Sequence, residues 1–379
     1  MPKEINIVSF DVPFPSNYGG VIDVYNKLVW LNKLGVKIHL HCFKYGRSSS
    51  SKLNDLCEKV YYYKRKTGLF SHLSFLTFTV KSRISNSLAN NLLSNDFPIL
   101  FEVLNTCFLL KDNRFTNRLK IYRHSNIEHI YYNALSKSET NILKKIYLKI
   151  EAFKLKRFEA ILNYSNLILA VNEKDSLYFK SKYPQVKSIY LPSFHPHHEL
   201  TILQGKGQYI LFHGNLSVSE NYEAAVWLIT NVFSKISFDC VIAGLNPPQF
   251  LIDLISKFKN IRLKINPSEE ELSLLILHAH IHVLYTSQET GLKLKLLNVL
   301  FNGRFIICNS KLLSGTDISS TISLKVSEDA NSFIENINYL VSQFYSDKMI
   351  EERSNQILTF NNKSNVKKLI EAVFINSNF

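Results

Sequence analysis

The sequence predicts an α/β protein built from two successive doubly wound units. Short apolar runs alternate with helical patterns along all 379 residues, and one irregular segment near the middle interrupts the alternation. Apolar residues make up 46 % of the chain, which is enough for two cores. An alternation of strands and helices builds parallel sheets with helices on both faces, and a chain of this length holds about two domains.

The first unit is expected to span residues 1–194. Its first strand is predicted at Ile5–Phe10, an apolar run that ends at a turn, and its first helix at Gly20–Leu34, which Gly35 ends as a C-cap. A long helical pattern covers Glu139–Asn163. The other strands predicted in this unit are Lys37–Phe43, Val60–Tyr63, Ile99–Val103, Lys120–His124, Leu167–Val171 and Ser188–Leu191.

An irregular segment separates the two units. Residues 192–208 contain two prolines, two glycines and three histidines without periodicity, and we interpret 195–208 as the linker. His195, His197 and His198 have no carboxylate or cysteine at ligand spacing, which favours a solvated loop over a metal site. The chain also lacks an Asp-x-Asp sequence, so we expect neither a metal nor a cofactor.

The second unit is expected over residues 209–350. Ser217 with Glu220 and Ser268 with Glu271 have capping-box spacing, and each pair predicts a helix start. Residues 351–379 form a C-terminal helix that we expect to return to the first unit. The other elements predicted in this unit are strands at Tyr209–Phe212, Asp239–Ala243, Ile261–Ile265, Ile281–Tyr285 and Phe305–Asn309, and helices at Pro247–Phe258, Gly291–Phe301 and Ser327–Gln343.

The positive charge of the chain is concentrated in its first half. The net charge is +14, and residues 1–195 contain 29 Lys and Arg against 14 Asp and Glu, whereas the remainder is nearly balanced. Such asymmetry indicates a negatively charged partner: a phosphorylated substrate, an anionic membrane or a nucleic acid. The alternative is a Lys-rich surface without a specific partner.

The sequence also indicates a compartment. It begins without the basic and apolar regions of a signal peptide, and no apolar stretch has the length of a membrane-spanning helix. The five cysteines are scattered and form no CxxC pair, which is typical of reduced thiols in a cytoplasmic protein. We therefore expect a cytoplasmic protein.

Two groups of candidate binding residues follow the first and fourth strands of the first unit. Gly19 and Gly20 stand just before a helix, where the backbone can approach a ligand and free N–H groups can bind an anion. Glu102 and Asn105 stand at the end of a strand, where substrates of such sheets bind. A turn glycine pair and a solvated Glu remain the structural alternatives.

A denser polar group follows the next strand. Arg123, His124, Asn126 and Glu128 lie within six residues at a strand-to-helix turn. An arginine neutralises phosphate, and His or Glu can bind sugar hydroxyls. Asn126 is alternatively a helix cap.

Two segments of the second unit suggest a diphosphate site. Gly214 and Asn215 follow its first strand. The segment from Gln288 to Asn298 ends a strand and starts a helix with two lysines in its first turns, a placement that opposes the helix dipole and that an anionic ligand would relieve. The candidate residues in this segment are Glu289, Thr290, Gly291, Lys293, Lys295 and Asn298.

At these residues the chain resembles the retaining GT-B glycosyltransferases of the family-4-like group, especially a bacterial branch named as mannosyltransferases. The resemblance extends over nearly the whole chain. Each motif is loose, but their order and spacing together are fairly specific. The stretches that match best are Ser9–Arg47, Ile99–Asn133, Leu191–Trp227 and Ala243–Gly315.

The resemblance implies a GT-B fold, with two Rossmann-like domains that face each other across a cleft, and a nucleotide-diphosphate sugar as donor. It places Lys293, Lys295 and the amides after Gly291 on the diphosphate. Asn298 stands where the family commonly has a Glu that binds the ribose. Gly19, Gly20, Gly214, Asn215 and Thr290 would also lie near the donor.

The resemblance also suggests roles in the first unit, which would take a glycan or lipid-linked acceptor. Glu289, Glu128 and His124 are the candidate catalytic residues, and Glu102, Asn105, Arg123 and Asn126 are candidate acceptor or sugar contacts. The branch tends to have Glu-Gly-Leu-His where this chain has Glu-Val-Leu-Asn at 102–105. It tends to have Arg-x-His-Asn-x-Glu where this chain has Arg-His-Ser-Asn-Ile-Glu at 123–128, so that His124 stands one place early. Attack from the face of the departing diphosphate, without a metal, would retain the anomeric configuration.

Basic and aromatic residues between Lys64 and Arg83 predict an interfacial helix on an anionic membrane, which would make the protein peripheral at the inner face. An ordinary core helix with basic ends is the alternative. Three other functions remain open: a sugar-nucleotide epimerase, a catalytically degenerate GT-B partner, and a nucleic-acid binder, although no nucleic-acid-binding motif is present.

Overall fold

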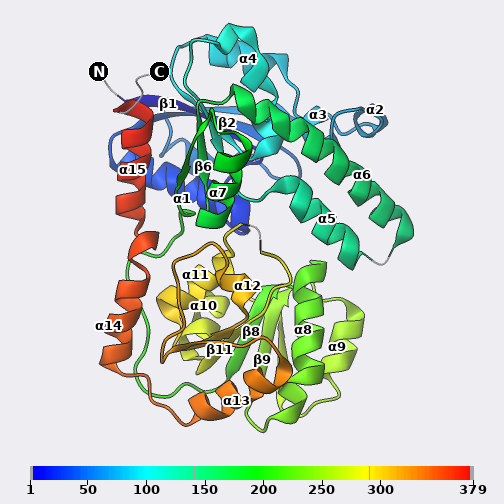
Figure 1. The fold of residues 1–379 in the computed structure, drawn as a ribbon, viewed down its shortest axis with the longest axis vertical. Helices are drawn as coiled ribbons and strands as arrows, with labels where there is room; N and C mark the ends of the chain where they lie inside the picture. Colours follow the sequence, from blue (N-terminus) through cyan, green and yellow to red (C-terminus); the bar gives the residue numbers. More distant parts are fainter. Residues whose placement is uncertain (1–2, 140, 290, 376–379) are drawn as a thin grey trace. The chain divides into compact units, whose positions relative to one another are not determined.

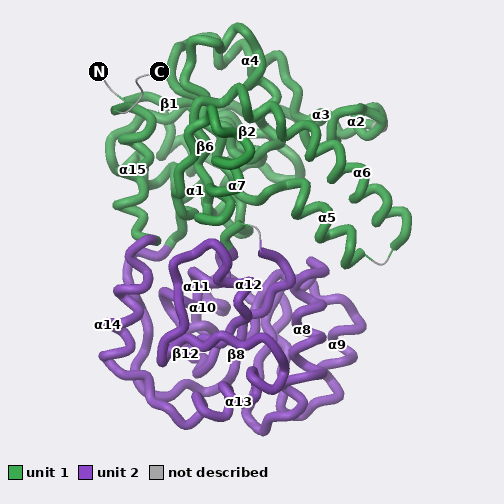
Figure 2. Tube along the Cα trace, viewed as in Figure 1, with its two compact units in different colours: residues 1–196, 290–292, 360–379 green, residues 197–289, 293–359 purple. Residues whose placement is uncertain are grey.

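A computed structural model describes residues 3–139, 141–289 and 291–375. The chain divides into two compact units (Figure 2). Unit 1 comprises residues 1–196, 290–292 and 360–379, and unit 2 comprises residues 197–289 and 293–359. Each unit is described by itself below.

Unit 1 is built on a parallel seven-stranded sheet with the order β3-β2-β1-β4-β5-β6-β7. Figure 1 labels β1, β2 and β6 of this sheet. The order reverses between β1 and β4, as in dinucleotide-binding folds. The apolar runs predicted as strands form this sheet because they are buried on both faces. The strands are β1 (Glu4–Ser9), β2 (Lys37–Lys44), β3 (Lys59–Lys64), β4 (Ile99–Glu102), β5 (Lys120–Arg123), β6 (Leu167–Ala170) and β7 (Lys187–Tyr190).

Helices cover both faces of this sheet, and each face has its own core. One core joins Ile7 and Leu28 to Val366 of the last helix, and the other joins Val8 to Phe179. The last helix thus packs in unit 1, against α1. The helices are α1 (Gly19–Lys33), α2 (Leu69–His72), α3 (Phe78–Lys81), α4 (Asn86–Leu93), α5 (Glu128–Ser138), α6 (Ile142–Phe158), α7 (Glu173–Lys182) and α15 (Asn362–Phe374), with 3₁₀ turns η1 (Ser51–Leu53), η2 (Leu104–Lys111), η3 (Asn113–Phe115) and η4 (Glu159–Tyr164).

Unit 2 has a parallel six-stranded sheet with the order β10-β9-β8-β11-β12-β13, again reversing beside its first strand. Its strands are β8 (Ile210–Asn215), β9 (Cys240–Leu245), β10 (Ile261–Ile265), β11 (Ile281–Leu284), β12 (Phe305–Cys308) and β13 (Leu324–Val326). Its helices are α8 (Ser219–Asn231), α9 (Gln249–Ile255), α10 (Glu269–His278), α11 (Leu294–Asn302), α12 (Ser310–Leu313), α13 (Ala330–Val341) and α14 (Asp347–Gln356), with η5 (Phe233–Lys235) and η6 (Leu358–Phe360). The predicted fold class of two doubly wound Rossmann-like units is confirmed.

Several local predictions were wrong. The capping box at Ser217 does not form: α8 begins at Ser219, and Ser217 instead donates to Asn215. The box at Ser268 with Glu271 does form. The long helix predicted at 139–163 is shorter, because α6 gives way to η4 at Glu159.

The interfacial helix predicted between Lys64 and Arg83 is absent as a single element. β3 extends to Lys64, and only the four-residue helices α2 and α3 follow. Arg83 is buried and donates to the carbonyl oxygen of Phe10 at 2.9 and 3.1 Å, so it cannot contact a membrane. Among the described residues, no helix combines the length and apolar character needed to cross a bilayer.

Candidate active site

The candidate donor site of unit 2 lies where its strand order reverses, at the carboxyl ends of β8 and β11. Ligands of doubly wound sheets bind at this position. Gly214 and Asn215 end β8, and Asn221 at the start of α8 donates to the Asn215 carbonyl at 2.9 Å. A Cβ on Gly244 of the adjacent strand would lie 2.1 Å from the Gly214 carbonyl oxygen, so only glycine permits this close approach.

Two lysines converge on this edge. Lys295 Nζ donates to Asn221 Oδ1 at 3.3 Å and to the Tyr285 carbonyl at 3.2 Å. Lys293 Nζ lies 3.8 Å from Glu220 Oε1. Burial lowers the pKa of Lys295 to about 8; the Glu220 charge opposes this shift and Lys293 adds to it. An anion bound here would stabilise both ammonium groups.

Helix α11 starts later than predicted, because Gly291 turns the chain with φ +70° and the helix begins at Leu294 with Lys293 as its N-cap. The predicted helix start at Gly291 was therefore wrong. Gly291 belongs to unit 1, where its N–H donates to Asp175 Oδ2 at 3.1 Å. Thr290 lies outside the described residues, and Glu289 before it is exposed.

Asn298, the candidate ribose contact, has a partner within unit 2. Its Oδ1 lies 2.9 Å from His197 Nε2, and its carbonyl accepts from Asn302 Nδ2 at 2.7 Å. Burial lowers the pKa of His197, against the opposing effect of this bond to Asn298. The linker histidine thus holds Asn298 in place on α11.

The Gly-Gly turn of unit 1 packs on its own loop. Gly19 begins α1, and a Cβ on Gly20 would lie 2.6 Å from the Phe10 ring, so Gly20 has a packing role as well. Arg47 donates to the Val12 carbonyl at 2.9 Å and ties the same loop to the end of β2. The loop is therefore held in one conformation beside the start of α1.

Glu102 and Arg123 are held in a buried network of four charges. Lys27 Nζ lies 2.6 Å from Glu102 Oε1 and 3.2 Å from Asp23 Oδ2. Arg123 binds both oxygens of Asp23 at 3.1 Å. All four residues are less than one-tenth exposed, so their charges are satisfied inside unit 1. The network fixes α1, and hence the Gly-Gly turn, to the carboxyl ends of β4 and β5.

Burial affects the two carboxylates of this network differently. Burial would raise the pKa of Asp23, but the charges of Arg123 and Lys27 outweigh it and hold that pKa below its usual range. Burial raises the pKa of Glu102, although Lys27 opposes the shift. Glu102 thus depends on its single lysine partner.

The residue after Glu102 has a strained backbone. Val103 adopts φ 59° and ψ 161°, a region that β-branched residues avoid. Asn105, the other candidate on this loop, lies in η2, and its Oδ1 is buried without a hydrogen-bond partner. The strain and the unsatisfied amide fall at the end of β4, beside the point where the strand order of unit 1 reverses.

His124 is buried at the end of β5. Its Nε2 lies 3.3 Å from Asp175 Oδ2, although outside hydrogen-bond geometry, and its Nδ1 accepts from the Val171 N–H at 3.5 Å. Burial, with a further contribution from Arg123, lowers the pKa of His124 to about 3, so the ring is neutral.

Asn126 and Glu128 complete this turn. Asn126 is not the predicted cap, because Ile127 occupies that position; its Oδ1 would lie 2.3 Å from a Cβ on Gly291. Burial raises the pKa of Glu128 to about 7, against the opposing charge of Arg83. A carboxyl with this pKa can accept or donate a proton near neutral pH.

Three residues beside the candidate donor site of unit 2 were not predicted from the sequence. Asn221 had no pattern to mark it, and Glu220 was assigned to a capping box. Thr286, fully buried after β11, donates to Glu220 through its hydroxyl. Its position directly after a predicted strand was the signal that could have identified it. No group of three or more potential metal ligands occurs within the part of the chain that the structure describes.

Known proteins resemble this chain in sequence and in fold. No family model matches the chain. The "Uncharacterized 44.6 kDa protein in cps region" of Klebsiella pneumoniae is 28 % identical over 356 residues, covering 89 % of this chain and 90 % of that protein.

Solved structures match over nearly the whole chain. WaaG, a glycosyltransferase involved in lipopolysaccharide biosynthesis, has a TM-score of 0.65 at 11 % identity, covering 98 % of this chain and 99 % of its own. Sucrose-phosphate synthase from Thermosynechococcus elongatus has a TM-score of 0.63 at 13 % identity, covering 98 % of this chain and 96 % of its own. Anabaena HepE in complex with UDP-glucose has a TM-score of 0.61 at 8 % identity, covering 97 % of this chain and 99 % of its own. These likenesses show that the chain has the GT-B fold, as its sequence predicted.

Proposed function

We propose that the protein is a retaining glycosyltransferase that moves a hexose from a nucleotide-diphosphate sugar to a glycan or lipid-linked glycan. The observation that carries the proposal is the pair Lys293 and Lys295 at the start of α11, on the edge where such folds bind ligands. Lysines at a helix start are unfavourable without an anion. A diphosphate would supply that anion.

The comparisons support the donor and the setting. HepE, with the same fold, is solved with UDP and with UDP-glucose. WaaG and WaaB act in lipopolysaccharide synthesis by their names, and the Klebsiella relative is in a cps region. We infer that the acceptor belongs to a cell-surface polysaccharide, and that the protein works in the cytoplasm at the inner face of the membrane.

The proposed mechanism places developing negative charge on the leaving diphosphate. Lys293, Lys295 and the first amides of α11 would stabilise that charge without a metal. Glu128, with its pKa of about 7, is the candidate to receive the proton of the acceptor hydroxyl. The Gly-Gly turn at Gly19 and the candidates Asn105 and Asn126 would contact the donor or acceptor sugar.

Calorimetry with GDP-mannose, UDP-glucose, UDP-galactose and UDP-N-acetylglucosamine tests the proposal. The Lys293→Met/Lys295→Met variant keeps the apolar stems but removes two charged donors, so it should bind the preferred donor about 100-fold more weakly. The matched control Lys257→Met/Lys259→Met changes two exposed lysines elsewhere in unit 2 and should bind normally. If no donor binds to the unmodified protein, a catalytically degenerate GT-B partner is the better assignment.

A further inference from the structure

Helix α6 of unit 1 is apolar on two opposite sides. Glu151, Ala152 and Leu155 face the body of unit 1 and are buried. A second apolar stripe at helical spacing faces solvent on the other side. Its members and their exposed fractions are Ile142 (72 %), Leu143 (79 %), Ile146 (50 %), Ile150 (49 %) and Phe153 (62 %). A helix in a globular protein normally buries one face only, so the second stripe requires an explanation.

Helix α2 and the loop from α2 to α3 carry further exposed apolar residues beside this stripe. Phe70, Leu73 and Phe75 are each more than four-fifths exposed. The segment from α2 to α3 is joined to α6 at both ends, because the Phe78 N–H donates to Glu151 Oε2 at 2.8 Å and His72 Nδ1 lies 3.4 Å from the Tyr147 hydroxyl. We call the exposed stripe of α6 together with these three residues the α6 surface.

Cations flank the α6 surface. Lys145, Lys149 and Lys156 form a row beside the apolar stripe, since they are spaced by four and seven residues. The one acidic residue of α6, Glu151, is buried and bound to Lys154 at 3.1 Å. A second copy of this chain would bring cations against cations, so the charge favours an anionic occupant.

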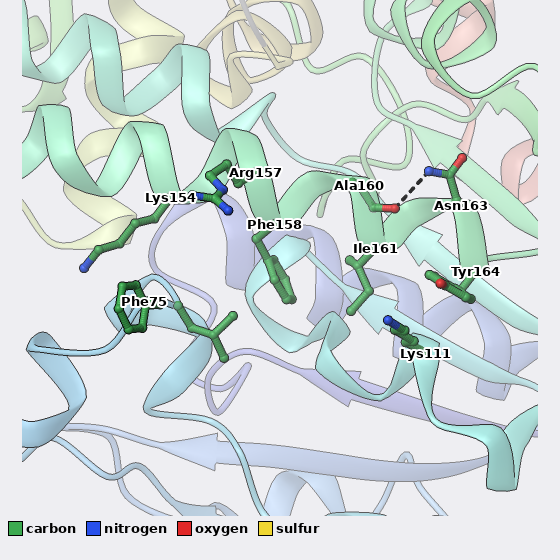
Figure 3. A pocket seen from close by; sticks show the side chains of 10 residues that line it. Phe75, Lys111, Lys154, Arg157, Phe158, Ala160, Ile161, Asn163 and Tyr164 are labelled. Carbon is green, nitrogen blue, oxygen red and sulfur yellow. Dashed lines mark hydrogen bonds between the residues drawn. The ribbon is translucent and has the colours of Figure 1, made fainter.

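A pocket of about 680 Å³ opens beside this surface (Figure 3). The cations Lys111, Lys154 and Arg157 line it, together with Phe75, Phe158 and Tyr164. Lys111 follows Leu110, whose carbonyl accepts from Lys120 Nζ at the start of β5. The pocket therefore lies near the amino ends of the strands of unit 1, at the end of the sheet opposite to Glu102 and Arg123.

We propose that the α6 surface is a membrane-docking site, with its apolar side chains inserted into the bilayer and the pocket occupied by the phosphate of an anionic phospholipid. An apolar stripe flanked by lysines is the pattern of a helix that lies in the lipid interface. A phosphate in the pocket would meet Lys111 and Arg157, beside the Lys154 that is paired with Glu151. This proposal replaces the interfacial helix predicted between Lys64 and Arg83. It rests on the proposed function, because a lipid-linked acceptor would require the protein to bind at a membrane surface.

Sedimentation of the full chain with vesicles tests the proposal. The protein should sediment with phosphatidylcholine mixed with phosphatidylglycerol much more than with phosphatidylcholine alone. Lys145→Gln/Lys149→Gln/Lys156→Gln should weaken the binding to the mixed vesicles on the order of 100-fold at low salt. The matched control Lys257→Gln/Lys259→Gln in unit 2 should bind as the unmodified protein does.

Two further variants separate the apolar and pocket contributions. Ile146→Ser/Ile150→Ser/Phe153→Ser should lower binding to both kinds of vesicle, because insertion is lost. Lys111→Gln/Arg157→Gln should reduce only the preference for phosphatidylglycerol, by roughly 30-fold. All variants should keep donor binding in calorimetry without lipid, which separates this proposal from the proposed function.

Three results would overturn the proposal. One is that the unmodified protein, while binding its donor, sediments with neither vesicle. Another is that inorganic phosphate at constant ionic strength displaces the protein from the mixed vesicles, which would make the pocket a site for a soluble phosphate. The third is a dimer in lipid-free ultracentrifugation that the triple serine variant dissociates, which would assign the surface to a second copy.

Discussion

Removing Lys27 from the buried network should destabilise unit 1 strongly. Its ammonium is fully buried and is the nearest cation to Glu102, at 2.6 Å, whereas Arg123 is engaged by Asp23. Lys27→Met keeps most of the volume but leaves a buried carboxylate without its partner. Breaking a buried pair from one side costs about 3–5 kcal/mol, and we expect a loss of this size.

The loss should depend on pH with a definite sign. Without Lys27, the already raised pKa of Glu102 rises further. A carboxyl with a raised folded-state pKa is neutral at low pH, and stability falls as the pH rises from its unfolded-state value through the folded one. Lys27→Met should therefore lower the free energy of unfolding of unit 1 less at pH 5 than at pH 8.

The chain contains two tryptophans, and each unit has one, which makes the assay specific. Trp30 lies in α1 and Trp227 in α8. In a Trp227→Phe background, fluorescence during urea unfolding reports on unit 1. Lys27→Met/Glu102→Gln removes both charges and should recover most of the loss. A loss below about 1 kcal/mol for Lys27→Met, or no recovery in the double variant, would refute the reasoning.

Three other substitutions have defined outcomes. Val103→Gly should lower the urea stability of unit 1 by less than the about 1.5–3 kcal/mol that burial of a valine contributes, because φ 59° suits glycine and the relieved strain offsets part of the loss; a larger loss would contradict the strain. Glu128→Gln should stabilise unit 1 at pH 8 by up to about 3 kcal/mol but not at pH 4, since the raised pKa of about 7 makes the charged form unfavourable; equal effects at both pH values would contradict that pKa. Gly244→Ala should destabilise unit 2 by about 1–3 kcal/mol and weaken donor binding, because its Cβ would displace the Gly214 carbonyl; normal thermal melting and calorimetry would disprove this.

The strands were predictable because burial on both faces leaves a local signature. Runs such as Ile5–Phe10 and Ile281–Tyr285 are apolar and short, and turn residues bound them, so each strand could be placed to within a few residues. The ends of these strands then placed the candidate residues at the carboxyl edge of each sheet, where ligands of such folds bind. Ser268 with Glu271 was recoverable for the same reason, since a capping box depends on four adjacent residues.

The rest depends on contacts that are distant in sequence. Glu220 has capping-box spacing from Ser217, but its carboxylate instead accepts a hydrogen bond from the hydroxyl of Thr286, 66 residues later. Glu102 was interpreted as a substrate contact, with a solvated strand-end acid as the alternative. Only the packing of α1 brings Lys27 to it. The exposed apolar stripe of α6 could not be predicted, because periodicity counts apolar positions without showing which of them pack against other parts of the protein.

The position of α15 affects how the chain can fold during synthesis. Val366, Leu369 and Val373 of this helix complete a core that residues 5–40 begin. Unit 1 therefore cannot close its core until α15 has left the ribosome, whereas all six strands of unit 2 have emerged earlier. Until then the apolar face of α1 that α15 covers is open to chaperones and to other nascent chains. Folding in vivo should consequently be limited by the arrival of the last helix, although the first strand is made first.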